Sequence, residues 1–190
     1  MWILGLILFH LVFWRRFYQN PFTHFTGESA AHEFPSARFL GESIRKGVYP
    51  PKDIYYWGDY SANPINTTFY PPHVLTAWIG SYLSLDRHFI LHTGCILAHY
   101  LFASVVGYYL FGEGLVGFFG AVTLAYMGYN IKGNASIVYT VSWMPVCLLG
   151  AKMGSCYLLA LGWGMALLGG YWPLAVYFGP FAWLVSLFLR

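Results

Sequence analysis

Beyond residue 70 the sequence is a series of apolar segments separated by very short polar breaks, and this pattern limits the possible folds more than any other feature. Only 9% of the residues are charged, against roughly 25% in a typical soluble domain. We therefore predict an integral membrane protein, with lipid around most side chains. The segments follow an apolar N-terminal run of residues 1–14 and lie near residues 72–85, 88–112, 115–130, 135–150, 155–169 and 171–189.

These segments are predicted to be helices rather than strands. They lack the alternation of apolar and polar residues that marks barrel strands, and an open sheet edge cannot face lipid. The predicted fold class is all-α, a polytopic membrane protein of about seven short transmembrane helices. Segments of about 15 residues would extend only about 22 Å, less than a hydrocarbon core of about 30 Å. Pro145 and Pro173 lie within such segments, so kinks are expected there.

Residues 15–70 form the one long hydrophilic region and hold six of the ten basic and five of the seven acidic residues. We interpret residues 1–190 as a single membrane domain in which residues 15–70 are an extramembrane loop. The net charge of +3 is small and forms no basic cluster, which argues against a nucleic-acid partner.

An amphipathic helix is predicted within this loop, at residues 35–47, where it would lie in the membrane interface and end at Gly47. Its apolar face comprises Ala37, Leu40 and Ile44. Its polar face comprises Arg38, Glu42 and Lys46, which follow one another at i,i+4 spacing. The helix could simply anchor the loop to the membrane, or it could roof a cavity that opens sideways to lipid.

Several motifs together resemble a known family. Residues 25–35 (FTGESAAHEFP), 39–50 (FLGESIRKGVYP) and 69–75 (FYPPHVL) resemble the first extracytoplasmic loop of bacterial YfhO-type membrane proteins, which belong to the GT-C glycosyltransferase superfamily. Residues 141–145 (VSWMP) look like the family's Trp-x-Pro helix, and residues 168–173 (LGGYWP) look like its Gly-His-Pro-Gln turn, here changed to Gly-Tyr-Trp-Pro. The chain would correspond to the seven-helix module of the superfamily, in the bacterial inner membrane.

The resemblance implies sugar transfer from a polyprenyl-phosphate carrier, with Glu28 at the position of the family's catalytic acid. One carboxylate can assist both deprotonation of the acceptor hydroxyl and the developing positive charge at the anomeric carbon. The family has Asp there, and the longer Glu would move the oxygens by about 1 Å, which can cost on the order of 10²-fold in rate. A solvated loop acid or a helix N-cap partner is the structural alternative for Glu28.

Four further loop residues are candidates for holding a divalent metal or a donor phosphate, although an ordinary polar loop would explain them equally well. They are His32, Glu33, Arg38 and Asp59.

A second candidate site is a polar stripe on the apolar helix that follows Arg87. His88, His92, Cys95 and His99 fall within about 60° of arc at 100° per residue, so they should face the protein interior. Imidazole nitrogens bind transition metals and tetrapyrrole metals, which makes His88, His92 and His99 candidate metal ligands. Hydrogen bonding across helices is the alternative.

Two functions of different classes remain open from the sequence. The first is a GT-C-like membrane glycosyltransferase module that uses a lipid-linked sugar. The second is a non-catalytic accessory subunit of a larger membrane complex, next to other membrane subunits and to haem or pigment. Both have membrane lipid as a partner.

Overall fold

The computed structural model describes residues 1–20, 33–49, 52–53, 58–59, 67–126 and 135–188. These residues are almost entirely helical, which confirms the all-α fold class. The strands β1 (Lys52–Asp53) and β2 (Gly58–Asp59) form a two-residue antiparallel pair. The helices are α1 (Trp2–Phe13), α2 (Arg15–Gln19), α3 (Phe34–Arg45), α4 (Pro71–Gly80), α5 (Leu85–Phe111), α6 (Leu115–Tyr126), α8 (Ala135–Val141), α9 (Met144–Met153), α10 (Cys156–Leu168) and α11 (Trp172–Phe188).

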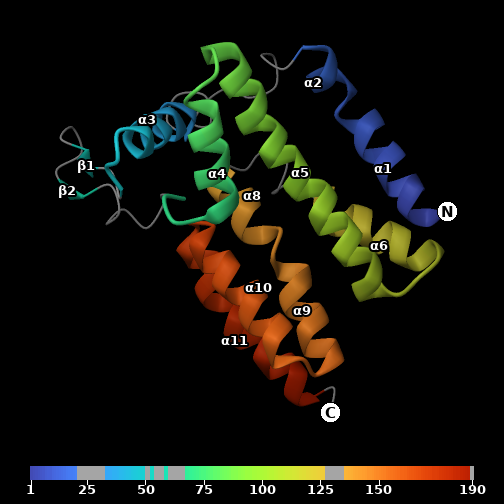
Figure 1. The fold of residues 1–190 in the computed structure, drawn as a ribbon. Helices are drawn as coiled ribbons and strands as arrows, with labels where there is room; N and C mark the ends of the chain where they lie inside the picture. The colour runs from blue at the N-terminus through green and yellow to red at the C-terminus, as the bar shows by residue number, and fades with distance from the viewer. Residues whose placement is uncertain (21–32, 50–51, 54–57, 60–66, 127–134, 189–190) are drawn as a thin grey trace.

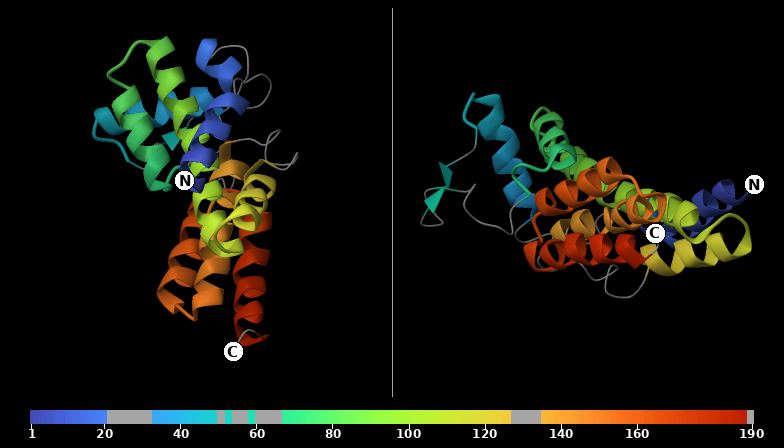
Figure 2. Two further views of the ribbon diagram at one scale, coloured as in Figure 1. Left: turned by 90° about the vertical axis from the view of Figure 1, so that its right-hand side faces the viewer. Right: turned by 90° about the horizontal axis from the view of Figure 1, so that it is seen from below.

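Helix α5 is the centre of the fold. Helices α3 and α4 pack near its N-terminal end, α6 folds back along its C-terminal half, and α1 runs beside it (Figure 1). Helices α8 and α9 also contact α5, whereas α10 and α11 pack on α8 and α9 and form the opposite side of the molecule (Figure 2). Helix α5 contacts α3 and α4 as well as α8 and α9, so its buried face connects the first two helices to the rest of the fold.

The apolar segment predicted at residues 135–150 is divided between α8 and α9. The break falls at Ser142–Trp143, and Pro145 occupies the first turn of α9, where its missing N–H is tolerated. A kink was also expected at Pro173, but that residue lies in the first turn of α11, where it starts the helix rather than bending it. The proline inside α11 is Pro180.

Glycines allow α9 and α10 to pack closely. A Cβ atom on Gly162 would come within 2.8 Å of the backbone nitrogen of Cys147, and one on Gly150 within 2.6 Å of the nitrogen of Leu159. The turn between the two helices needs Gly154, whose φ of +66° ends α9 in the left-handed conformation. Close contact through small residues is typical of helix pairs in membranes.

Two helices of the described residues are long and apolar enough to cross a membrane: Leu85–Phe111 and the α8–α9 unit, Ala135–Met153. Four other apolar helices have 10–17 residues, namely Trp2–Phe13, Leu115–Tyr126, Cys156–Leu168 and Trp172–Leu187. Trp2–Phe13, Leu115–Tyr126 and Cys156–Leu168 would each extend about 15–20 Å. A helix of that length cannot span a hydrocarbon core of about 30 Å.

Candidate functional site

The predicted amphipathic helix is α3, and two of the three residues expected on its buried face are buried, whereas the third, Ile44, is half-buried. Ala37 and Leu40 are buried, and the Arg38 Nε donates to the Glu42 carboxylate at 2.8 Å on the other face. Gly47, with a φ of +76°, follows the helix end. Since the Arg38 and Glu42 side chains are about one-third exposed, their ion pair adds little to stability.

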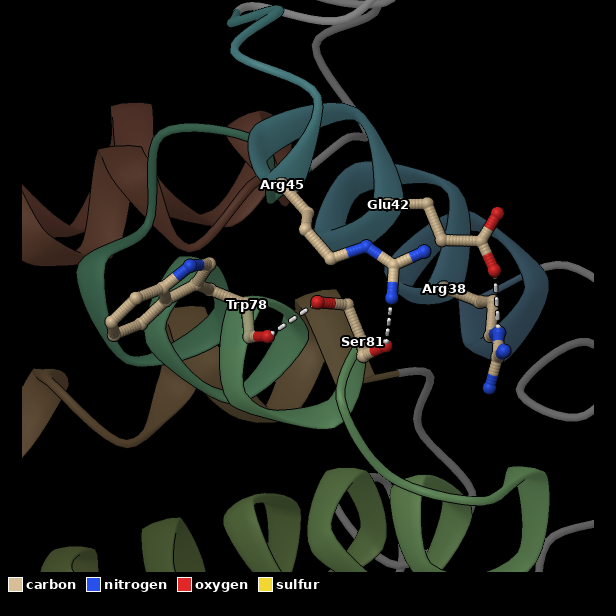
Figure 3. A network of polar contacts seen from close by, with 5 residues as sticks. All are labelled: Arg38, Glu42, Arg45, Trp78 and Ser81. Carbon is tan, nitrogen blue, oxygen red and sulfur yellow. Dashed lines mark hydrogen bonds and ion pairs between the residues drawn. The ribbon is translucent and has the colours of Figure 1, made fainter.

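Helix α3 is held against α4 at two places, and Figure 3 shows the second of them, where Arg45 reaches Ser81. Gly41 faces the Ala77 carbonyl so closely that a Cβ atom would come within 2.0 Å of its oxygen. One turn later, the Arg45 Nη1 donates to the carbonyl oxygen of Ser81 at 3.2 Å, and the guanidinium lies 5.8 Å from the ring centre of Tyr82. Helices α3 and α4 therefore pack as one unit, with the Arg45 guanidinium at its edge.

An open apolar groove of about 370 Å³ runs along this unit. Its aromatic and aliphatic walls come from the end of α3, the segment before α4 and the outer face of α4. Tyr49 at the groove donates its hydroxyl to the Thr68 carbonyl at 2.9 Å, and partial burial raises the pKa of this phenol. Arg45 and Lys46 follow directly after the groove residue Ile44 and are exposed. The lining residues are Ile44, Tyr49, Phe69, Pro71, Val74, Leu75 and Trp78.

Of the loop residues predicted to bind substrate, Glu33 has a structural partner far away in sequence. Its carboxylate accepts hydrogen bonds from the backbone amides of Ala135 at 2.7 Å and Ser136 at 3.2 Å. These amides begin α8, and a carboxylate at a helix N-terminus is stabilising because it satisfies free N–H groups and opposes the helix dipole. Glu33 thus joins the start of α3 to α8.

The other predicted loop residues either have partners of their own or lie outside the described residues. Arg38 pairs with Glu42 on its own helix, and the backbone of Asp59 pairs with Lys52 in the short strand pair. Glu28 and His32 lie outside the described residues.

The predicted polar stripe of α5 is buried, as expected. His88, His92 and His99 are exposed by 0%, 2% and 7%. His99 is the end of a chain of hydrogen bonds that begins with the residues just before α4 and α9. The Trp143 Nε1 donates to the Tyr70 oxygen at 2.7 Å, and the Tyr70 hydroxyl donates to the His99 Nε2. Because the His99 Nδ1 lies 2.6 Å from the Cys95 carbonyl, which can only accept, Nδ1 carries the proton and Nε2 accepts from Tyr70.

The three histidines predicted as ligands do not form one metal centre. Both ring nitrogens of His99 are used in the chain just described. His88 packs so closely on α4 that a Cβ atom on Gly80 would meet its Cδ2 at 2.1 Å. Among the described residues, no three His, Cys, Asp or Glu side chains group closely enough to hold a metal ion. The stripe is therefore a packing interface between helices. His99 makes hydrogen bonds there, and His88 packs against α4.

Sequence reasoning missed a fourth histidine. His73 of α4 is 4% exposed, and its ring centre lies 5.7 Å from that of His92 and 5.9 Å from that of Tyr139. The sequence signal was weak, because His73 follows two prolines and has no histidine at helical spacing. Only the packing of α4 on α5 brings the two rings together.

Several imidazole nitrogens in this region have no hydrogen-bond partner among the described residues. They are the Nδ1 of His73 and both nitrogens of His88 and of His92. A buried polar group without a partner costs about 1–3 kcal/mol, and such groups are rare in folded proteins.

Comparisons of the chain with protein families, with curated proteins and with solved structures found no match.

Proposed function

We propose that the chain is a polytopic membrane protein in which about seven short helices lie in the bilayer and α3 lies at its surface. Large apolar side chains on the outer helices support this proposal, since Val116, Tyr157, Tyr177 and Phe181 are exposed by 73%, 86%, 75% and 56%. Such surfaces are costly in water and favourable in lipid. Tilting cannot lengthen a short helix, so bilayer thinning and interfacial side chains would accommodate the shorter ones.

We further propose that it acts as a GT-C-like module that binds a polyprenyl-phosphate-linked sugar. The observation that carries this proposal is the apolar groove of α3 and α4, with Arg45 and Lys46 at its edge. An isoprenoid chain would lie along Val74, Leu75 and Trp78, and the phosphate would accept hydrogen bonds from the guanidinium and ammonium groups. Glu28 would then act as the acid or base of sugar transfer.

A photoreactive polyprenyl phosphate tests the groove. In proteoliposomes we expect Leu75→Trp to reduce labelling strongly, because the indole would fill the groove. Leu161→Trp on α10 is the matched control, since Leu161 and Leu75 are exposed by 51% and 52% and Leu161 lies outside the groove. Equal labelling of the two variants would remove the groove from the proposal.

Glu28→Gln tests the chemistry separately, with lipid-linked sugar turnover as the measurement. Loss of turnover with unchanged labelling is the expected result, because the amide keeps the shape of the side chain but cannot take a proton. Unchanged turnover would remove Glu28 from the mechanism.

A non-catalytic accessory subunit is the second candidate function. It is favoured by the intramolecular roles of Glu33 and Arg38, which bind α8 and Glu42 instead of standing free for a substrate. Purification in mild detergent separates the two candidates. Co-purification with other membrane subunits or with a chromophore would support the accessory role, and a chain that runs alone without either would argue against it.

A further inference from the structure

Two imidazoles on neighbouring helices have no role in the lipid groove or in the hydrogen bonds of His99. His73 of α4 and His92 of α5 are 4% and 2% exposed, and their ring centres lie 5.7 Å apart with the planes at 73°. The Nδ1 of His73 and both nitrogens of His92 have no hydrogen-bond partner in the described part of the chain. Buried polar atoms without partners are rare in folded proteins, and a bound ion that takes one nitrogen of each ring would account for two of these three atoms.

The separation of the rings fits a shared metal ion. Imidazole nitrogens bind transition metals at about 2.0–2.1 Å, so two rings on one ion have their centres within roughly 6 Å of each other. The observed 5.7 Å lies inside this limit. An ion bound by two imidazoles lies in the plane of both rings, and planes at 73° allow this, whereas rings stacked face to face do not.

The surroundings favour an ion of low charge. The rings in contact with the pair include Phe34, 5.9 Å from His92, and Tyr139, 5.9 Å from His73, and both are uncharged at neutral pH. His88 and His99 also lie close enough to interact electrostatically with His73. The cost of moving an ion from water into such surroundings rises steeply with its charge, and neutral imidazoles do not offset a second positive charge. Copper binds well to imidazole and has a stable monovalent state.

We propose that His73 and His92 together bind one copper(I) ion between α4 and α5. The neighbouring histidines do not complete a larger site. His99 has both nitrogens in hydrogen bonds, and His88 is wedged against the backbone of Gly80. A two-ligand site also agrees with the finding that no three metal-binding side chains group together in the described residues.

Anaerobic titration of the full chain in detergent with copper(I), against a chromophoric chelator, tests the site. We expect one copper(I) per chain, and at least about a 100-fold loss of affinity in His73→Gln and in His92→Gln, because each removes one of two direct ligands. His88→Gln is the matched control on the same helix face and should keep the wild-type affinity. Absence of copper(I) binding by the wild-type chain, or tighter binding of zinc(II), would overturn the proposal.

X-ray absorption of the copper-loaded wild-type chain gives a test that does not depend on folded variants. Two nitrogen neighbours are expected, whereas sulfur neighbours or a higher coordination number would contradict the assignment. Circular dichroism of the glutamine variants shows whether each has kept its helices, and wild-type affinity in a folded His92→Gln chain would exclude this residue. The result is independent of the lipid groove, because no groove residue takes part.

Discussion

The carboxylate of Glu33 accepts a hydrogen bond from the backbone amide of Ala135 at 2.7 Å, across 102 residues of sequence. A second bond from the next amide makes this acid the partner of the N-terminus of α8. The loop that was predicted to bind substrate is therefore fixed at this point to the helices that contact α5. The residue that directly precedes α3 thus satisfies free N–H groups of a distant helix.

Replacing Glu33 by Gln should destabilise the protein by about 1 kcal/mol, because the neutral amide keeps one acceptor oxygen and loses the interaction with the helix dipole. The midpoint of thermal unfolding in detergent, followed by circular dichroism, measures the effect. Glu113→Gln is the control at an exposed position and should leave the midpoint unchanged. Equal midpoints for the two variants would show that the contact with α8 contributes nothing.

Gly41→Ala should separate α3 from α4, because the added methyl would meet the carbonyl oxygen of Ala77, a backbone atom that cannot turn aside. A loss of about 1–3 kcal/mol is expected for such overpacking. Gly164→Ala in α10 is the control, since its Cβ would have nothing within 4 Å. That variant should gain up to about 1 kcal/mol from the better helix propensity of alanine. A stabilising Gly41→Ala change would contradict the close contact of the two helices.

Tyr70→Phe removes the hydroxyl that links Trp143 and His99. Because it leaves the half-buried Trp143 donor and the buried His99 acceptor without partners, we expect a loss of at least about 2 kcal/mol. Tyr49→Phe is the comparison, because that hydroxyl makes one bond at the half-exposed groove and should contribute about 0.5–1 kcal/mol. Chemical unfolding followed by tryptophan fluorescence would detect the difference, and a smaller effect for Tyr70 than for Tyr49 would argue against the chain of bonds.

Glu42→Gln should change stability by no more than about 0.5 kcal/mol, because Arg38 and Glu42 are an i,i+4 pair with partly exposed side chains. The wild-type midpoint should also change little between low and high salt if this pair is the main charge contact of α3. A loss of several kcal/mol in this variant would contradict the small contribution expected of a partly exposed pair.

Helix positions were predicted well because they depend on local periodicity. The apolar segment at 88–112 became α5 at Leu85–Phe111, and the spacing of Ala37 and Leu40 placed the buried face of α3 correctly. The division of residues 135–150 at Ser142–Trp143 agrees with the bend expected near Pro145. The kink expected at Pro173 was wrong, since a proline in an apolar run can equally well begin a helix, and the sequence around it did not distinguish the two.

By itself, the sequence determined where most of the apolar helices lie, most of the buried face of α3 and that the histidines of α5 point inward, because each follows from the repeat of the helix and from the composition of one segment. Only the tertiary structure decided that His73 meets His92, that Glu33 binds the start of α8 and that His99 is held by Tyr70. These contacts join segments far apart in the chain. The close approach of α3 to α4 at Gly41 and of α4 to α5 at Gly80 is likewise a result of tertiary packing, and no local pattern encodes that distance.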